Sequence, residues 1–239
     1  VGTTAGAHNM AGKTTKVIDL RGKFVLPGFH DSHVHLIDGG VEMIQCDLKE
    51  CETVEQILES IRNYAKSHGR AAWVTGGGWG LPIFGVNGPT KEVLDAVVSE
   101  RPVYLESQDH HSGWANSLAL RRAGITALTK DPQDGRIERL PNGEPSGTLR
   151  ESAMDLVHKI VPPLKSADRL KGLELAQSKA LEFGITSVYD AACDEKRLSA
   201  YRNFEQHKSL NLAVTAALRC RPEKDEKQVL EFSRWRSKY

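Results

Sequence analysis

The sequence predicts an α/β fold. Along most of the 239 residues, short apolar runs of strand length alternate with segments whose apolar side chains recur at helical spacing. Glycines stand where several of the helical segments stop. Two parallel strands need a long connection, usually a helix on one face of the sheet, so this alternation favours parallel strands joined by crossover helices. About five such strands are visible, and no sequence repeat is present.

The N-terminal region comes first and has its own pattern. Residues 1–14 are small and polar without a period, and two apolar runs, 16–20 and 24–29, then flank turn residues at 21–23. This arrangement predicts a short hairpin that leads into a strand.

The best-defined helix is predicted from Thr53 to Ser67. Its apolar residues share one face, Thr53 and Gln56 form a capping-box pattern, and Gly69 ends it. The elements expected after it, in chain order, are a strand at 71–74, a glycine-rich loop at 76–78, a helix at 90–98, a strand at 102–105, a helix at 114–123, a hairpin or excursion loop at 131–147, a helix at 167–183, a strand at 185–190, a helix around 198–204, a strand at 210–218 and a helix around 229–235.

The composition indicates which classes of molecule the protein is expected to bind. With 32 basic and 31 acidic side chains, the formal net charge is +1, so no strong field attracts nucleic acid or an anionic membrane. We therefore expect a small-molecule substrate. The four cysteines lack zinc-site spacing and disulfide density, and no apolar run reaches the roughly 20 residues of a membrane span, so we expect a cytoplasmic protein with reduced thiols.

The chemically most informative segment is Pro27–Leu36, which reads PGFHDSHVHL. Alternate side chains of a strand share one side, so Asp31, His33 and His35 are expected together. Neutral imidazoles two residues apart on one side can offer two nitrogens to one divalent ion, and Asp31 could bond one ring and fix its tautomer. An isolated His-x-His is more often a surface pair or a hydrogen-bonded core pair.

The context of this segment resembles the first-strand signature of the amidohydrolase superfamily. Later segments resemble landmarks of the branch called amidohydrolase family 3, which includes deacylases and formamide deformylase-like proteins. These landmarks, which cover nearly the whole chain, are Gly78-Trp79, Pro89-Thr90, Leu94-Asp95, Arg101-Pro102-Val103, His111 with Trp114-Ala115-Asn116-Ser117, Gly147-Thr148-Leu149-Arg150-Glu151 and Gly184-Ile185-Thr186-Ser187-Val188.

The resemblance implies a (β/α)₈ barrel with a small β-sandwich built from both chain ends. Residues 1–26 would be a remnant of that sandwich, and residues 27–239 the N-terminal part of a partial, TIM-like barrel. His33 and His35 match the first-strand ligands of one or two divalent ions, with zinc expected. The implied reaction is hydrolysis of a non-peptide C–N bond by a metal-activated water.

The sequence departs from the resemblance in its later ligands. A bridging lysine or acid, two further histidines and an aspartate base have no matching motif before Tyr239, and the chain begins at Val1 without an initiator methionine. We expect a truncated chain with an incomplete site. The alternatives are an inactive scaffold or binding protein, or a hydrolase acting on an ester or a ring amine. Half a barrel would also expose strand edges and apolar faces, which favours aggregation or a homo-oligomer.

Three further residues are candidates for catalytic roles. His111 follows the strand at 103–107 and matches a landmark, with an ordinary loop histidine as the alternative. Glu151 follows the excursion loop and is expected to begin a helix, where a carboxylate is favoured without any catalytic task. Asp190 ends the strand at 185–189, where it equally suits the N-cap of the next helix.

Overall fold

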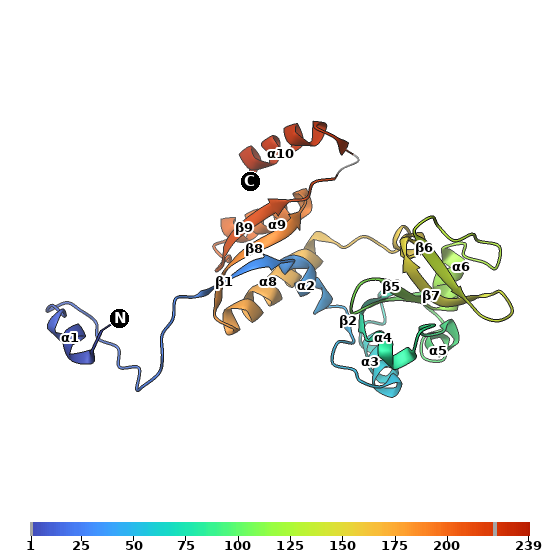
Figure 1. Cartoon of the computed structure of the whole chain (residues 1–239), viewed down its shortest axis with the longest axis horizontal. Helices are drawn as coiled ribbons and strands as arrows, with labels where there is room; N and C mark the ends of the chain where they lie inside the picture. Colours follow the sequence, from blue (N-terminus) through green and yellow to red (C-terminus); the bar gives the residue numbers. More distant parts are fainter. Residues whose placement is uncertain (1, 222–223) are drawn as a thin grey trace.

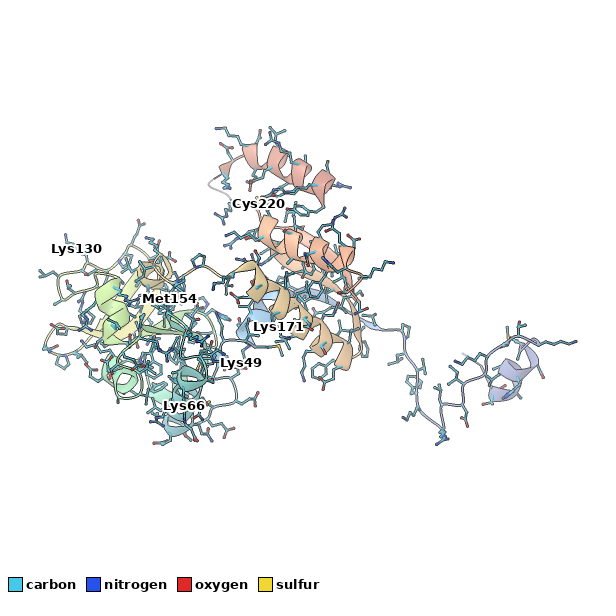
Figure 2. The ribbon with its side chains drawn as sticks, turned by 180° about the vertical axis from the view of Figure 1, so that it is seen from behind. Lys49, Lys66, Lys130, Met154, Lys171 and Cys220 are labelled. Atoms are coloured by element: carbon cyan, nitrogen blue, oxygen red, sulfur yellow. The ribbon has the colours of Figure 1, made fainter. Side chains whose placement is uncertain are left out.

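The structure, a computed structural model, describes residues 2–221 and 224–239 and shows a mixed α/β fold (Figure 1). Its strands form two open sheets, and the described residues contain no closed barrel. We call residues 29–42 and 166–221, which hold the three-stranded sheet, the parallel lobe. We call residues 46–158, which hold the six-stranded sheet, the insertion lobe. Figure 2 shows the molecule from behind, with Lys66 and Lys130 on the insertion lobe and Lys171 on the parallel lobe.

The parallel lobe is a short βα series interrupted by the insertion lobe. Its strands are β1 (Phe29–Val34), β8 (Ile185–Cys193) and β9 (Ala213–Leu218), all parallel in the order β1-β8-β9. Its helices are α2 (Leu36–Glu42), α8 (Ser166–Glu182) and α9 (Glu195–Gln206), and α10 (Lys227–Lys238) follows β9. The core lies between the sheet and these helices, where Ile37, Leu173 and Val188 are almost fully buried.

The insertion lobe is a mixed sheet with short helices. Its strands are β2 (Cys46–Asp47), β3 (Val74–Trp79), β4 (Val103–Ser107), β5 (Ser112–Ala115), β6 (Gly135–Arg139) and β7 (Pro145–Glu151), in the order β2-β3-β4-β5-β7-β6. Its helices are α3 (Val54–Ser67), α4 (Leu81–Phe84), α5 (Lys91–Asp95), α6 (Ser117–Arg122), the 3-10 turn η1 (Ser152–Met154) and α7 (Asp155–His158). β2, β3 and β4 are parallel, and the remaining pairs are antiparallel.

Several sequence predictions are confirmed in this lobe and others are wrong. The capping box of Thr53 and Gln56 is present at the start of α3, and the 131–147 excursion forms the β6–β7 hairpin. The glycine cluster 76–78 is not a loop but part of β3. Close backbone approach is nevertheless its role, because a Cβ on Gly76 would lie 2.2 Å from the carbonyl oxygen of Cys46.

The predicted parallel series of about five strands is also corrected. The runs at 71–74 and 102–105 contribute to β3 and β4, which pair in parallel but belong to the insertion sheet. The helix expected at 114–123 starts only at Ser117. Trp114 and Ala115 lie in β5 instead, where both side chains are fully buried, and the buried Asn116 caps the helix.

The predicted N-terminal hairpin is absent. A short helix, α1 (Thr4–Asn9), stands away from both lobes on an extended segment (Figure 1). Within residues 16–28 the turn survives as a hydrogen bond from the N–H of Lys23 to the carbonyl of Leu20, 3.0 Å long. No flanking strands form there, and the apolar side chains of Val17 and Phe24 stay exposed. A two-stranded hairpin with nothing to pack against is marginal in water, which accounts for the difference.

Unpaired edges are present as the sequence suggested. β1 and β9 each have one edge without a strand neighbour within residues 2–221 and 224–239. Over the part of the chain that the structure describes, no helix combines the length and apolar character needed to span a membrane.

The contact between α2 and α8 gives a stability prediction with its own control. A Cβ on Gly40 would lie 2.0 Å from the carbonyl oxygen of Gly172, whereas one on Gly39 meets nothing within 4 Å. We expect Gly40→Ala to destabilise the parallel lobe by about 2 kcal/mol or more, because the helices must separate. Gly39→Ala should stabilise by up to about 1 kcal/mol through helix propensity. Urea denaturation followed by circular dichroism tests this; equal effects of the two variants would contradict it.

Candidate functional site

His33 and His35 lie together at the carboxyl end of β1. Val34 ends the strand and His35 is the N-cap of α2, so both imidazoles sit where the strand passes into the helix. The ring centroids are 5.5 Å apart and the planes are nearly perpendicular. Both side chains are exposed. The expected proximity of the two rings is therefore present, and metal binding by them stays a prediction.

The neighbouring strand orients the second imidazole. Nδ1 of His35 lies 3.0 Å from the carbonyl oxygen of Ala191 on β8. A carbonyl only accepts, so this contact places the proton on Nδ1 and leaves the lone pair of Nε2 free for a cation. Asp31, which was expected to be able to bond one ring, accepts through Oδ1 a hydrogen bond from the backbone N–H of His33 at 3.0 Å.

His111 and Glu151 form a second pair, in the insertion lobe. His111 follows β4 in a tight loop, and Glu151 is the last residue of β7. Nδ1 of His111 lies 3.0 Å from Oε2 of Glu151, and the Glu151 N–H donates to the His111 carbonyl at 3.1 Å. Glu151 therefore does not begin an α-helix as expected. It adopts a left-handed φ of 49° and precedes only a 3-10 turn.

This pair gives a prediction about protonation. The hydrogen bond and charge of Glu151 raise the pKa of His111 above its usual value. The imidazolium form is therefore favoured at a pH where an isolated histidine would be mostly neutral. We expect Glu151→Gln to lower that pKa toward about 6.5, and Glu144→Gln, whose carboxylate contacts Lys91 instead, to leave it unchanged. Histidine-resolved NMR titration measures both; an unchanged midpoint in Glu151→Gln would contradict the pairing.

Asp190 lies on the strand beside the His33 and His35 pair, but its side chain is directed into the core. It lies within β8, opposite Val34 of β1, and its side chain is buried toward the helices, where it accepts a hydrogen bond from the Tyr201 hydroxyl of α9. Burial raises the pKa of Asp190, although the bond from Tyr201 acts the other way. The suggested N-cap role is wrong, because β8 continues to Cys193 and Asp194 caps α9.

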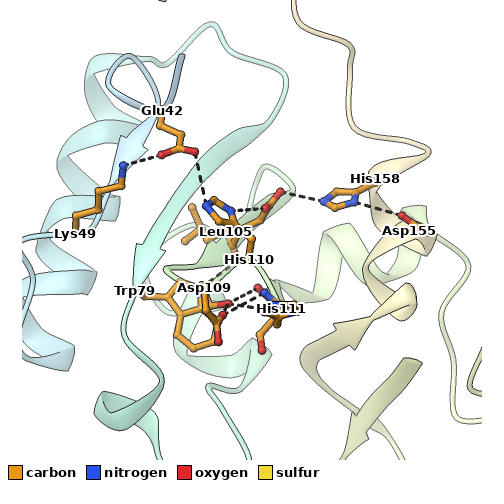
Figure 3. A network of polar contacts seen from close by, with 12 residues as sticks. Glu42, Lys49, Trp79, Leu105, Asp109, His110, His111, Asp155 and His158 are labelled. Atoms are coloured by element: carbon orange, nitrogen blue, oxygen red, sulfur yellow. Dashed lines mark hydrogen bonds and ion pairs between the residues drawn. The ribbon is translucent and has the colours of Figure 1, made fainter. Parts of the chain in front are cut away.

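A polar network that sequence reasoning missed lies between the lobes (Figure 3). Glu106, at the end of β4, contacts two histidines: His110 Nδ1 at 3.3 Å and His158 Nε2 at 3.0 Å. His110 Nε2 also lies 3.9 Å from a Glu42 carboxylate oxygen on α2, across the boundary. The sequence offered only one signal, that His110 adjoins His111. His158 is 52 residues from Glu106.

The side chains near His33 and His35 fit only part of the ligand set that the implied metal needs. Within residues 2–221 and 224–239, no group of three or more His, Cys, Asp or Glu side chains is arranged to hold an ion. Two neighbouring imidazoles, those of His33 and His35, are suitable zinc ligands. Because Nδ1 of His35 is bonded to the Ala191 carbonyl, Nε2 of that ring is available to bind the ion. The pair supplies part of a ligand set.

Comparison with known proteins identifies a family and several relatives of this chain. Residues 16–239 match the family model described as the amidohydrolase family. The chain is 37% identical to Protein LONG AFTER FAR-RED 3 of Arabidopsis thaliana, over 80% of this chain and 33% of that protein. It is 34% identical to N-substituted formamide deformylase of Arthrobacter pascens, over 84% of this chain and 39% of that protein. The chain thus spans roughly a third of the length of these curated relatives.

Two solved structures share the fold. An uncharacterized metal-dependent hydrolase from Pyrococcus furiosus has a TM-score of 0.60 and 30% identity, over 90% of this chain and 42% of that one. A second, from Pyrococcus horikoshii OT3, has a TM-score of 0.63 and 24% identity, over 91% of this chain and 41% of that one. Both lobes are therefore included in the similarity.

Proposed function

The chain belongs to the amidohydrolase family, and from this premise we propose that it carries the first ligand pair of a metal-dependent hydrolase acting on a C–N bond of a small organic substrate. The observation that carries the proposal is the placement of His33 and His35 side by side at the carboxyl end of a parallel strand. Functional groups in barrel enzymes gather at this end of the strands.

The proposal assigns His33 and His35 as ligands of a divalent ion, with zinc as the expected metal. Such an ion, when bound, polarises the scissile carbonyl and lowers the pKa of a coordinated water. The protein's own contribution is orientation: the Ala191 carbonyl holds the Nδ1 proton of His35, so that Nε2 points its lone pair outward from a fixed ring.

His111 and Glu151 are proposed to serve the substrate. Held by Glu151 through Nδ1, a protonated His111 keeps the N–H of Nε2 available to donate to a carbonyl or carboxylate oxygen. Both side chains are exposed, so a substrate can reach them without displacing the core. Asp190 is proposed instead as a structural acid, because its side chain is buried and its Oδ2 accepts a hydrogen bond from Tyr201.

The relatives support a C–N bond as the target. N-substituted formamide deformylase matches 84% of this chain at 34% identity, and the family model, which spans residues 16–239, includes both histidine pairs. A second candidate, a binding scaffold without catalysis, is favoured by one observation: the described residues assemble no complete ligand group.

The test is hydrolysis of N-benzylformamide by protein expressed from the native reading frame with Zn²⁺ added, with formate followed by NMR. Zinc-dependent release that disappears in His33→Ala but persists in His8→Ala, an exposed histidine bonded only to its own helix, would support the hydrolase. Absence of formate with this and a panel of N-acyl amines, although the protein is folded, would favour the scaffold.

A further inference from the structure

The contact that orients His35 depends on an irregular stretch of β8. Between Asp190 and Cys193, β8 has one residue more than the facing stretch of β9, which makes a β-bulge. Within this bulge Ala192 has a left-handed φ of 61°, which is uncommon for a residue with a Cβ. The carbonyl of Ala191, in the peptide just before Ala192, lies 3.0 Å from Nδ1 of His35. The bulge thus presents a backbone carbonyl to the residue that follows the neighbouring strand β1.

This hydrogen bond needs support from elsewhere in the parallel lobe. The His35 side chain is exposed, so water competes with the Ala191 carbonyl for its N–H. The bond persists where donor and acceptor are already held in place, because otherwise ordering both groups costs conformational entropy. The two groups lie on different elements, the start of α2 and the end of β8. A third element that binds both therefore determines how well the bond is kept.

Helix α9 binds both elements through two side chains one helical turn apart. The hydroxyl of Tyr201 donates a hydrogen bond to Oδ2 of Asp190, the residue directly before Ala191. The guanidinium of Arg197 donates to both carboxylate oxygens of Asp38, in the first turn of α2, over distances of 2.6 to 3.2 Å. Residues four apart share one face of a helix, so a single face of α9 contacts the strand that carries the acceptor and the helix that carries the donor.

Both contacts of α9 are better shielded from water than the His35 bond that they flank. Tyr201 is 7% exposed and Asp190 is 1% exposed. The Arg197 side chain is 23% exposed, and its Nη1 also lies 3.1 Å from the carboxylate of Asp194, the N-cap of α9. A planar guanidinium that binds carboxylates on two sides has little freedom to rotate. Two well-held contacts thus fix the geometry of one exposed contact.

We propose that Arg197 and Tyr201 are positioning residues for His35. They hold the start of α2 and the end of β8 together, so that the Ala191 carbonyl keeps the proton of His35 on Nδ1. This inference rests on the proposed function, in which His35 binds the ion through Nε2. The partner of one ring nitrogen determines which tautomer a neutral histidine adopts, so loss of either positioning residue leaves the His35 ring free to exchange tautomers.

The test reads the tautomer of His35 directly and needs no zinc. At pH 8.5, where ordinary imidazoles are neutral, ¹⁵N NMR of the labelled full chain distinguishes the Nδ1–H form from the Nε2–H form. We expect the Nδ1–H form of His35 to exceed the other at least about fivefold in the parent, the factor that one ordinary hydrogen bond supplies. Tyr201→Phe and Arg197→Met should each reduce that excess at least about threefold.

Two control variants separate positioning from a general loss of stability. Arg202→Met removes an exposed arginine of the same helix that pairs with Glu205, and it should change neither the stability nor the tautomer ratio appreciably. Gln177→Ala removes a buried side chain of the same lobe that bonds the Ser209 carbonyl and the Asn211 N–H. It should lower the urea midpoint and leave the tautomer ratio of His35 unchanged.

Zinc affinity is the second measurement on the same variants. Isothermal titration should show Zn²⁺ binding about 10-fold weaker in Tyr201→Phe and Arg197→Met, at the low end of the effect expected for partners outside the ligand shell. A changed tautomer ratio together with no zinc binding by the parent would support the positioning of His35 and overturn the proposed function instead. The two failures are therefore distinguishable.

Either of two results would overturn the positioning proposal. One is a tautomer ratio of His35 that is unchanged in both Tyr201→Phe and Arg197→Met. The other is an equal change of that ratio in Gln177→Ala, which would mean that any destabilisation of the lobe has the same effect. Circular dichroism confirms that each variant is folded. Tyr201→Phe removes a single oxygen atom, so it keeps the test decisive even where Arg197→Met does not fold.

Discussion

Asn116→Ala is expected to destabilise the insertion lobe by about 4 kcal/mol. Its amide is fully buried and makes four hydrogen bonds at once. Oδ1 accepts from the backbone N–H groups of Val103 and Ala119, and Nδ2 donates to the carbonyls of Val98 and Arg101. Alanine leaves four backbone groups without this partner, three of them buried and one half-buried, each costing about 1–3 kcal/mol before relaxation, and removes a helix cap.

The measurement is urea unfolding followed by tryptophan fluorescence. Trp73, Trp79 and Trp114 all lie in the insertion lobe, so the signal reports mainly on that lobe even if the lobes unfold separately. Asn142→Ala is the matched control: this exposed asparagine accepts only from the N–H of Glu144 in the β6–β7 turn, and its loss should cost less than about 1 kcal/mol. Similar midpoints for the two variants would show that the Asn116 bonds contribute little.

The second large effect is expected on metal affinity. Changing His33 and His35 together to alanine should weaken Zn²⁺ binding at least about 100-fold, because loss of partners in the outer shell alone costs 10–100-fold and these are proposed ligands. Isothermal titration of the parent and variant with Zn²⁺ measures it. The control is His8→Ala/His207→Ala, since both rings are exposed and bonded only to carbonyls of their own helices. Equal losses in the two double variants would mean that binding is unspecific.

Much of the fold follows from local pattern. The capping box of α3, the helix α8 and the β6–β7 hairpin are determined by residues close in sequence, and their predictions are confirmed. What sequence pattern could not supply was the assignment of strands to sheets. The apolar run at 102–105 has the same pattern whether it joins β8 or β3, and only long-range pairing decides that it joins β3.

In the candidate site, too, features set by residues close in sequence were predictable, whereas long-range contacts were not. The proximity of His33 and His35 follows from strand geometry and was predictable, whereas the carbonyl that orients His35 belongs to Ala191, 156 residues later, and has no sequence signal. The Glu106 network is equally long-range, since it joins three elements of two lobes. The predicted cap role of Asp190 failed because β8 is longer than its apolar run, which moves the cap to Asp194.

The central claim is that His33 and His35 bind a divalent ion, and histidine-selective ¹H–¹⁵N NMR during a Zn²⁺ titration tests it most directly. The chain has nine histidines, so each ring can be followed separately. We expect His35 to be protonated on Nδ1 before zinc is added, and the ring signals of His33 and His35 to shift together at stoichiometric zinc while those of His8 and His207 do not. Unchanged signals of His33 and His35, with zinc bound elsewhere or not at all, would contradict it.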